Sequence, residues 1–179
     1  MTSNRKVILF IAMSLDGFIA KTDDDISFLS VVEQPGEDYG YSAFMKSVDA
    51  VILGRKTYDK ILSMPSGLTY GERDVFVLTR KPKPAENKIT FYSGSLSELI
   101  STLKSNDGRN IFCDGGAETV HRFLQNNLFD EIIISIIPVL LGNGIRLFNE
   151  GFPGTKLELI QAKSFEKGLA QLHYLVRKD

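Results

Sequence analysis

The chain has 179 residues, of which 43% are hydrophobic and 24% charged, and its net charge is -1. These values are typical of one globular domain, expected over residues 1–179, and they give no reason to expect nucleic acid as a partner. No stretch approaches the ~20 apolar residues of a membrane span, so no membrane contact is expected. The single cysteine, Cys113, excludes an internal disulfide and is compatible with the cytoplasm, where we expect the protein to reside.

The first third of the sequence alternates apolar runs with segments of helical spacing. Val7 to Ala12 is continuously apolar, as expected of a strand buried on both faces, and residues 17–20 are expected to extend it after a kink. Residues 21–37 contain a Pro-Gly turn signal and are predicted to form a loop or an irregular crossover. A helix across residues 39–47 and a strand across residues 49–53 are expected next.

A second series of helices and strands follows. The sequence predicts a helix from Arg55 to Leu62, strands at 74–79 and 89–92, a helix that starts at Ser95, a strand at 110–113 and a helix through residues 117–124. Ser95 and Glu98 match a capping box, in which each side chain satisfies a free N–H group at the helix start. Because strands alternate with helices, we expect a largely parallel sheet covered by helices.

The last third changes character, because no long helix separates its strands. Residues 131–142, 156–160 and 169–176 are predicted strands, and residues 165–168 are the expected turn of a terminal hairpin. Consecutive strands without a crossover helix pair antiparallel most easily. The sequence therefore predicts a mixed sheet, parallel early and antiparallel at the end.

Two apolar runs end at glycine and lead directly into predicted helices. One is Val51 to Tyr58, with Gly54 at the turn, and the other is Ile111 to Thr119, with Gly115-Gly116 at the turn. Such a turn leaves free N–H groups and the positive end of a helix dipole facing one spot, which suits a phosphate. Each turn alone is better explained by tight-turn chemistry, but a pair suits the two phosphates of a dinucleotide.

Six motifs, in order along nearly the whole chain, resemble one known family. They are Ser14-Leu-Asp16-Gly17-Phe-Ile-Ala20, Ile52-Leu-Gly54-Arg55-Lys56-Thr57-Tyr58, Val77-Leu-Thr79-Arg80, Asp114-Gly115-Gly116-Ala117, Leu128-Phe-Asp130-Glu131 and Pro138-Val-Leu-Leu-Gly142-Asn-Gly144-Ile-Arg-Leu-Phe148. The family is the dihydrofolate-reductase-like superfamily, in the branch of the C-terminal reductase domain of the riboflavin-biosynthesis enzyme RibD. The resemblance implies a three-layer α/β fold, with helices on both faces of a mixed, mostly parallel sheet and antiparallel C-terminal strands.

The same resemblance implies NADPH as the hydride donor and assigns its contacts. The nicotinamide would lie at Ala12, Ile19 and Ala20. One side of the pyrophosphate would be held by Gly54, Arg55, Lys56 and Thr57, the adenine and 2′-phosphate would be flanked by Thr79 and Arg80, and the second phosphate turn would be formed by Gly115, Gly116, Ala117 and Glu118. Arginine, lysine and a threonine hydroxyl suit phosphate oxygens chemically, although the alternative for the basic residues is an ordinary solvated surface.

The sequence leaves the catalytic acid and the substrate contacts open. Dihydrofolate reductases use a carboxylate on the first helix, but residues 39–47 contain no acid. Glu37 and Asp38 just precede that segment, and Asp16 lies near the expected nicotinamide. The alternative for these three acids is a structural role at a helix start or turn. Tyr41 and Phe44 are candidates to stack on a flat substrate, with core packing as the alternative.

We therefore expect an NADPH-dependent oxidoreductase that transfers a hydride to a small heterocycle of pterin or aminopyrimidine type, as in 5-amino-6-(5-phosphoribosylamino)uracil reductase or dihydrofolate reductase. An NADPH-binding protein of this fold without turnover is the alternative. No metal is expected, because the acids at 23–25 lack further ligands at a suitable spacing. A homodimer is expected, because residues 132–141 are strongly apolar and members of this branch often pair through their C-terminal strands.

Overall fold

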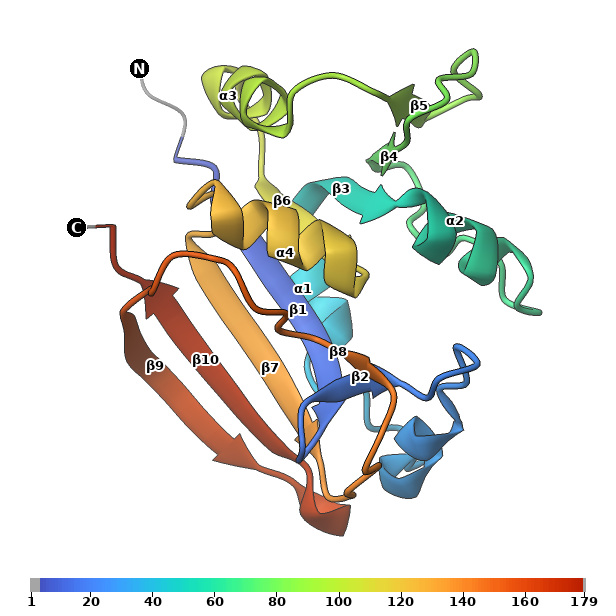
Figure 1. The fold of residues 1–179 in the computed structure, drawn as a ribbon, viewed down its shortest axis with the longest axis vertical. Helices are drawn as coiled ribbons and strands as arrows, with labels where there is room; N and C mark the ends of the chain where they lie inside the picture. Colours follow the sequence, from blue (N-terminus) through green and yellow to red (C-terminus); the bar gives the residue numbers. More distant parts are fainter. Residues whose placement is uncertain (1–3, 179) are drawn as a thin grey trace.

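The structure, a computed structural model, describes residues 4–178 (Figure 1). Residues 1–3 and 179, which belong to the domain predicted over residues 1–179, lie outside the described part. The strands are β1 (Val7–Ser14), β2 (Phe18–Ala20), β3 (Val48–Gly54), β4 (Asp74–Leu78), β5 (Ile89–Tyr92), β6 (Asn110–Gly115), β7 (Glu131–Ile137), β8 (Ile145–Arg146), β9 (Leu157–Ser164) and β10 (Ala170–Val176). The helices are α1 (Tyr41–Lys46), α2 (Arg55–Leu62), α3 (Leu96–Ser105) and α4 (Ala117–Gln125), with short 3-10 helices η1 (Ser27–Val32) and η2 (Glu166–Gly168).

One eight-stranded sheet runs through the molecule in the order β5-β4-β3-β6-β1-β7-β10-β9 (Figure 1). The strands from β5 to β7 in this order pair in parallel, whereas β10 pairs antiparallel with both β7 and β9. The predicted mixed sheet with antiparallel C-terminal strands is therefore confirmed. Its parallel part brings the carboxyl ends of β1, β3 and β6 to one edge.

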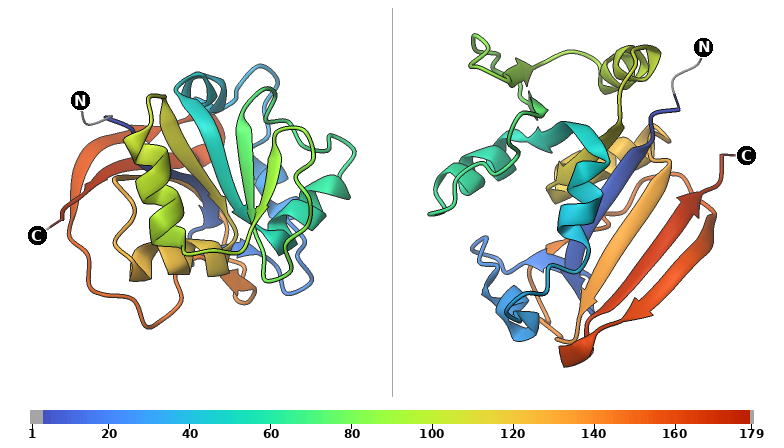
Figure 2. Two further views of the ribbon diagram at one scale, coloured as in Figure 1. Left: turned by 90° about the horizontal axis from the view of Figure 1, so that it is seen from above. Right: turned by 180° about the vertical axis from the view of Figure 1, so that it is seen from behind.

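Helices cover both faces of the parallel strands, as the resemblance implied. Because successive strand residues face opposite sides, Ile52 packs in one core cluster with α3 and α4, while Leu53 packs in the other with α1 and with Tyr58 of α2. Figure 2 shows α1 and α4 on opposite sides of β1. Phe112 and Phe123 are fully buried, one in each cluster.

The segment after β1 differs from the prediction. Residues 17–20 do not extend β1, because the chain turns at Gly17, which has a φ of +90° and donates its N–H to the Ser14 carbonyl at 2.9 Å. β2 instead pairs antiparallel with β8 in a separate two-stranded sheet. The partner strand lies more than a hundred residues away in the sequence, so no local pattern could indicate this pairing.

Residues 21–37, predicted as a loop or an irregular crossover, contain a short helix. This helix is η1, whose Phe28 and Val32 are buried and pack with residues of β7 and of the chain before β10. Helix α1 starts two residues later than the predicted one, because Tyr39 and Gly40 have φ values of 55° and 82°, outside the helical region. The result is a folded segment that covers the end of β1.

The C-terminal strands are the least covered part of the sheet. All eight residues of the edge strand β9 are exposed, and three of them, Leu157, Leu159 and Ile160, are large and apolar. The strand predicted over residues 131–142 ends at Ile137, because the following Pro138 has no N–H for the ladder. The turn predicted at residues 165–168 is present and contains η2.

Neither a membrane span nor a metal cluster occurs within residues 4–178. No helix there has the length and apolar character needed to cross a bilayer. No three His, Cys, Asp or Glu side chains there are placed to hold a metal ion. Cys113 is fully buried in β6, and this burial raises the pKa of its thiol.

Candidate functional site

The two glycine turns lie side by side at the carboxyl edge of the sheet. β3 and β6 are neighbours, and Leu53 pairs with Gly115, so both strands reach their turns at the same level. Gly54 and Gly116 then directly precede α2 and α4. One strand pairing thus brings together the two turns that the sequence indicated.

A threonine from each helix closes the space between the turns. Thr57 Oγ1 of α2 accepts a hydrogen bond from the Gly116 N–H at 2.7 Å. A Cβ atom added at Gly54 would lie 2.6 Å from Oγ1 of Thr119 in α4, and one added at Gly116 would lie 3.0 Å from Thr57 Oγ1. Each glycine therefore faces the threonine of the other turn, and the two turns form one interlocked unit.

Neither α2 nor α4 has a side-chain cap at its start. By contrast, the Ser95 hydroxyl caps α3 by accepting the Glu98 N–H at 3.4 Å, which is one half of the predicted capping box. The first-turn N–H groups of α2 and α4 and the positive ends of their dipoles therefore converge without a side-chain acceptor. Such a place suits an anion with two phosphate groups.

Basic side chains lie around this anion site. Arg55 pairs with Asp59 at 2.8 Å and lies 5.8 Å from the centre of the Phe91 ring. Arg80 is 96% exposed, and its guanidinium lies 3.8 Å from the Glu118 carboxylate in the first turn of α4. That contact places Arg80 beside the second glycine turn. Of the other predicted cofactor residues, Lys56 is exposed, Thr79 is half-buried and Ala117 is buried.

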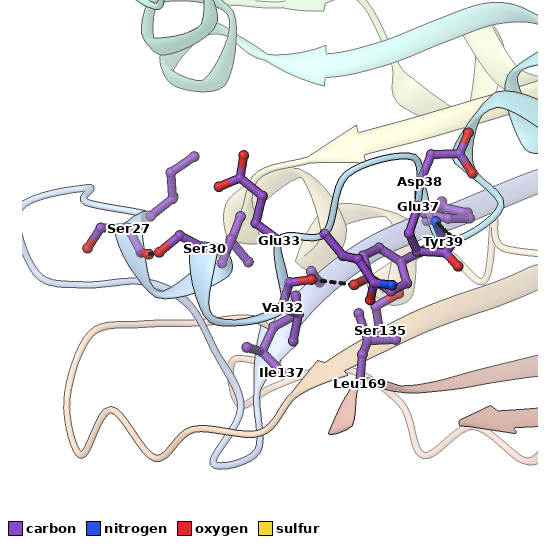
Figure 3. A pocket seen from close by; sticks show the side chains of 15 residues that line it. Ser27, Ser30, Val32, Glu33, Glu37, Asp38, Tyr39, Ser135, Ile137 and Leu169 are labelled. Carbon is purple, nitrogen blue, oxygen red and sulfur yellow. Dashed lines mark hydrogen bonds between the residues drawn. The ribbon is translucent and has the colours of Figure 1, made fainter. Parts of the chain in front are cut away.

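A cavity of about 510 Å³ opens beside the carboxyl end of β1 (Figure 3). Its lining includes Ala12, which the resemblance placed at the nicotinamide, and the predicted acids Glu37 and Asp38. Two of its lining residues, Phe10 and Ala12, belong to β1, which pairs with β6, the strand that ends at the second glycine turn. The full lining is Phe10, Ala12, Ile26, Ser27, Leu29, Ser30, Val32, Glu33, Gln34, Glu37, Asp38, Tyr39, Ser135, Ile137 and Leu169.

Glu37 and Asp38 are hydrogen-bonded to the chain that follows them. Glu37 Oε1 accepts the Tyr39 N–H at 2.7 Å, and the two oxygens of Asp38 accept the N–H groups of Gly40 and Ser42 at 2.9 and 3.0 Å. The hydrogen bonds from Ser42 and Gly40 hold the pKa of Asp38 below its usual range, so Asp38 is ionised at neutral pH. Both acids therefore stabilise the start of α1, and their catalytic role stays a prediction.

Asp16 connects two loops. Its carboxylate accepts the Ser14 hydroxyl at 2.5 Å and the N–H groups of Leu141 and Gly142 at 3.1 and 2.7 Å. The bond from Ser14, with those from the two backbone groups, lowers the pKa of Asp16 to about 2. These contacts favour the structural alternative for Asp16, because an ionised carboxylate with all these donors has no proton to give.

β2 presents Ile19 and Ala20 beside the loop that leads into β8. Gly144 approaches so closely that a Cβ atom added there would lie 2.2 Å from the Ala20 carbonyl oxygen. Arg146 lies over the Phe18 ring, 4.7 Å from its centre. The segment expected at the nicotinamide is therefore held in place by a backbone contact that requires glycine.

Tyr41 and Phe44 face the sheet. Phe44 stacks on Phe10 with ring centres 4.7 Å apart, and Tyr41 meets the same ring edge-on at 5.7 Å. Neither side chain lines the cavity. Phe44 is buried in the core, which favours the packing alternative, and burial raises the pKa of Tyr41 to about 12. Their contact with substrate stays a prediction.

Asp114 is an acid beside the second glycine turn that was not among the predicted site residues, and it does not line the cavity. It lies at the end of β6, and because Leu9 of β1 pairs with Cys113, Asp114 is on the same sheet face as Phe10 of the cavity. Tyr70 donates its hydroxyl to Asp114 Oδ2. Removal from water raises the pKa of Asp114 to about 6, and the bond from Tyr70 opposes the rise. Its position directly before a glycine turn was the sequence signal that could have indicated Asp114 as a candidate site residue.

The chain has relatives along nearly its whole length. A family model described as the RibD C-terminal domain matches residues 59–171. Two proteins of Bacillus subtilis (strain 168) are similar. YwjB is 42% identical over 172 residues, covering 96% of this chain and 98% of the relative, and YyaP is 29% identical over 188 residues, covering 97% and 98%.

Solved structures share the fold. A protein from Shewanella sp. PV-4, described as a putative riboflavin biosynthesis protein, is 32% identical, with a TM-score of 0.87 and coverage of 97% of this chain and 99% of that one. A Thermotoga maritima deaminase and 5-amino-6-(5-phosphoribosylamino)uracil reductase is 15% identical, with a TM-score of 0.71 and coverage of 97% and 57%. At that identity the second likeness shows the fold alone.

The close approach at Gly144 gives a testable prediction. We expect Gly144→Ala to lower the free energy of unfolding by about 2 kcal/mol or more, because a side chain at a strained backbone position costs of order 1–3 kcal/mol and here also meets the Ala20 carbonyl. The matched control is Gly154→Ala, whose Cβ would have no atom within 4 Å. Urea unfolding measures both variants, and equal stabilities would show that the contact has no energetic consequence.

Proposed function

The chain belongs to the RibD C-terminal domain family, and on that premise we propose that it is an NADPH-dependent reductase that transfers a hydride to a small heterocycle of pterin or aminopyrimidine type. The observation that carries the proposal is the interlocked pair of glycine turns next to the cavity over β1. The turns offer an anion site, and the cavity offers room for a flat ring beside it.

The residues of the chain fit this cofactor. Gly54 and Gly116 let the two turns pack against each other through Thr119 and Thr57, and the uncapped starts of α2 and α4 offer N–H donors to the pyrophosphate. Arg80, exposed beside α4, suits the 2′-phosphate. Ala12 lines the cavity, where the nicotinamide would meet the substrate. The cofactor supplies the hydride when bound, and the protein orients both partners and excludes water.

Reduction of a C=N group also needs a proton, and we propose Asp114 as its donor. It lies on the same sheet face as Phe10 of the cavity, although it does not itself line the cavity. Its pKa is raised to about 6, so a fraction of the carboxyl groups is protonated near neutral pH. Asp16 and Asp38 are poorer donors, because their hydrogen bonds lower their pKa values.

NADPH oxidation with a panel of dihydropterin and aminopyrimidine substrates tests the proposal. Steady oxidation with any of them supports a reductase. Tight NADPH binding without oxidation across the panel favours the alternative, a cofactor-binding protein of this fold. Absence of NADPH binding would contradict both.

We also propose a homodimer in the cytoplasm. The uncovered strand β9 supports the dimer, because Leu157, Leu159 and Ile160 are 44%, 53% and 52% exposed at the edge of the sheet. A second copy covering this strand would remove apolar surface and unpaired edge groups from water. Light scattering is expected to give twice the chain mass, and the mass of a single chain at working concentration would contradict the dimer.

Arg80 is the residue that distinguishes the two nicotinamide cofactors. We expect Arg80→Ala to weaken NADPH binding roughly 10- to 100-fold, since hydrogen bonds to charged groups contribute about 1.5–3 kcal/mol, while NADH binding changes little. Titration of both cofactors against the variant measures this. Arg177→Ala is the control, because Arg177 is a half-exposed arginine that pairs with Glu158 of β9. Equal losses for NADPH and NADH would refute the 2′-phosphate contact.

The pH dependence of turnover tests Asp114. Because a proton donor must be protonated, the rate is expected to fall as the pH rises through about 6, and Asp114→Asn should reduce it by roughly 10²–10⁴-fold. Tyr70→Phe removes a hydrogen bond that stabilises the carboxylate, so the falling limb should move to higher pH. An unchanged profile in both variants would exclude Asp114 as the donor.

A further inference from the structure

The floor of the cavity over β1 contains a buried hydroxyl group. Ser135 of β7 lines the cavity and is only 4% exposed (Figure 3). Its partners on the neighbouring strands are Ala12 of β1 and Gln171 of β10. Paired residues of neighbouring strands have their side chains on one face of the sheet, so the hydroxyl lies next to Ala12, where the nicotinamide is proposed to bind. A ligand held by this hydroxyl would therefore lie beside the cofactor.

Gln171 fixes the direction of this hydroxyl. Its side-chain Nε2 donates to the Tyr39 backbone carbonyl at 3.0 Å and to Ser135 Oγ at 3.0 Å. A backbone carbonyl oxygen can only accept a hydrogen bond, so the amide atom that faces Tyr39 must be the nitrogen. Because the same nitrogen donates to Ser135 Oγ, the hydrogen of the Ser135 hydroxyl must point to a different acceptor.

Residues 4–178 provide no acceptor for the hydrogen of the Ser135 hydroxyl. The other hydroxyl groups of the cavity differ in this respect. Those of Ser27, Ser30 and Tyr39 each donate to an acceptor in their own segment, with donor–acceptor distances of 2.6 and 2.8 Å for the two serines. A buried donor without a partner is unfavourable, so the position of Ser135 points to an acceptor supplied by a ligand.

The shape of the floor indicates which kind of acceptor fits. The short side chain of Ser135 lies among the larger apolar side chains of Phe10, Ile137 and Leu169, which line the same cavity. A carbonyl oxygen projects beyond the edge of a ring and can reach a recessed hydroxyl. A nitrogen within the ring is held farther away by the ring atoms on either side of it. The floor therefore favours a carbonyl oxygen.

We propose that Ser135 is a substrate-binding residue whose hydroxyl donates to a carbonyl oxygen of a flat ring in the cavity, and that Gln171 positions this hydroxyl. The inference rests on the proposed reductase function and names the side chain that orients the substrate beside the nicotinamide. A neutral hydroxyl suits an uncharged carbonyl oxygen, and the apolar lining suits the faces of the ring.

Two uncharged probes that differ at one ring position test the inference without turnover. 2-Aminopyrimidin-4-one, which carries a carbonyl group, and 2-aminopyrimidine, which does not, are titrated by calorimetry against the full chain, with and without NADPH, at pH 7. We expect the carbonyl compound to bind about fivefold more tightly, because only it offers a projecting acceptor. Equal binding of the two probes, or no binding of the carbonyl compound in either condition, would overturn the inference.

Substitution of Ser135 locates the effect. Ser135→Ala removes the hydroxyl and is expected to weaken binding of the carbonyl compound about fivefold, while binding of 2-aminopyrimidine is unchanged. The matched control is Ser30→Ala, which removes a lining hydroxyl that already has an acceptor in the chain. A preference for the carbonyl compound that survives Ser135→Ala, or that is lost equally in both variants, would show that Ser135 is not the donor.

Substitution of Gln171 tests its positioning role. In Gln171→Glu a carboxylate oxygen replaces the donating nitrogen, so it accepts the Ser135 hydrogen and leaves none for a ligand. The preference for the carbonyl compound is then expected to disappear although Ser135 is still present. If urea unfolding shows that this variant does not fold, Gln171→Met removes the donor without adding an acceptor, and a partial loss of the preference is expected. An undiminished preference in a folded variant would contradict the positioning role.

The reductase proposal and the Ser135 proposal fail in different ways. If the chain is not an NADPH-dependent reductase, NADPH neither binds nor is oxidised, while the preference for the carbonyl compound and its dependence on Ser135 persist. If Ser135 does not bind the substrate, NADPH binding is intact and the two probes bind equally, or their difference is unchanged in Ser135→Ala.

Discussion

The parallel pairing of β3 with β6 is the constraint on which the site depends. Its register sets Leu53 against Gly115, so both strands end at glycine at one level and both following helices start there. The contacts of Gly54 with Thr119 and of Gly116 with Thr57 exist only in this register. A slip of one residue would turn every side chain of a strand to the other face and separate the two turns.

Basic and acidic side chains lie in separate regions along the same sheet edge, which the overall net charge does not reveal. A net charge of -1 suggests no preference for ligands of either charge. Arg55 and Arg80 nevertheless lie around the helix starts, whereas Glu33 and Asp38 line the cavity. β1, between β6 and β7, joins the two regions.

Local patterns in the sequence predicted much of this architecture. Helix α2 and strand β5 have the predicted bounds. The glycine turn before α2 and the apolar run of β5 are local patterns that define these elements without any contact to distant segments. What local patterns could not give are contacts between distant segments, such as the pairing of β2 with β8 or the bond from Tyr70 to Asp114. The motifs identified the glycine turns, but the loop composition did not indicate how η1 folds over β1 and β7 to form one wall of the cavity.

A crystal structure of the chain with NADPH tests the central claim most directly. The account predicts the pyrophosphate between the turns at Gly54 and Gly116, within hydrogen-bond distance of first-turn N–H groups of both α2 and α4, and the nicotinamide beside Ala12. Cofactor bound through only one of the two helices, or lying in the cavity between Glu33 and Asp38, would contradict it.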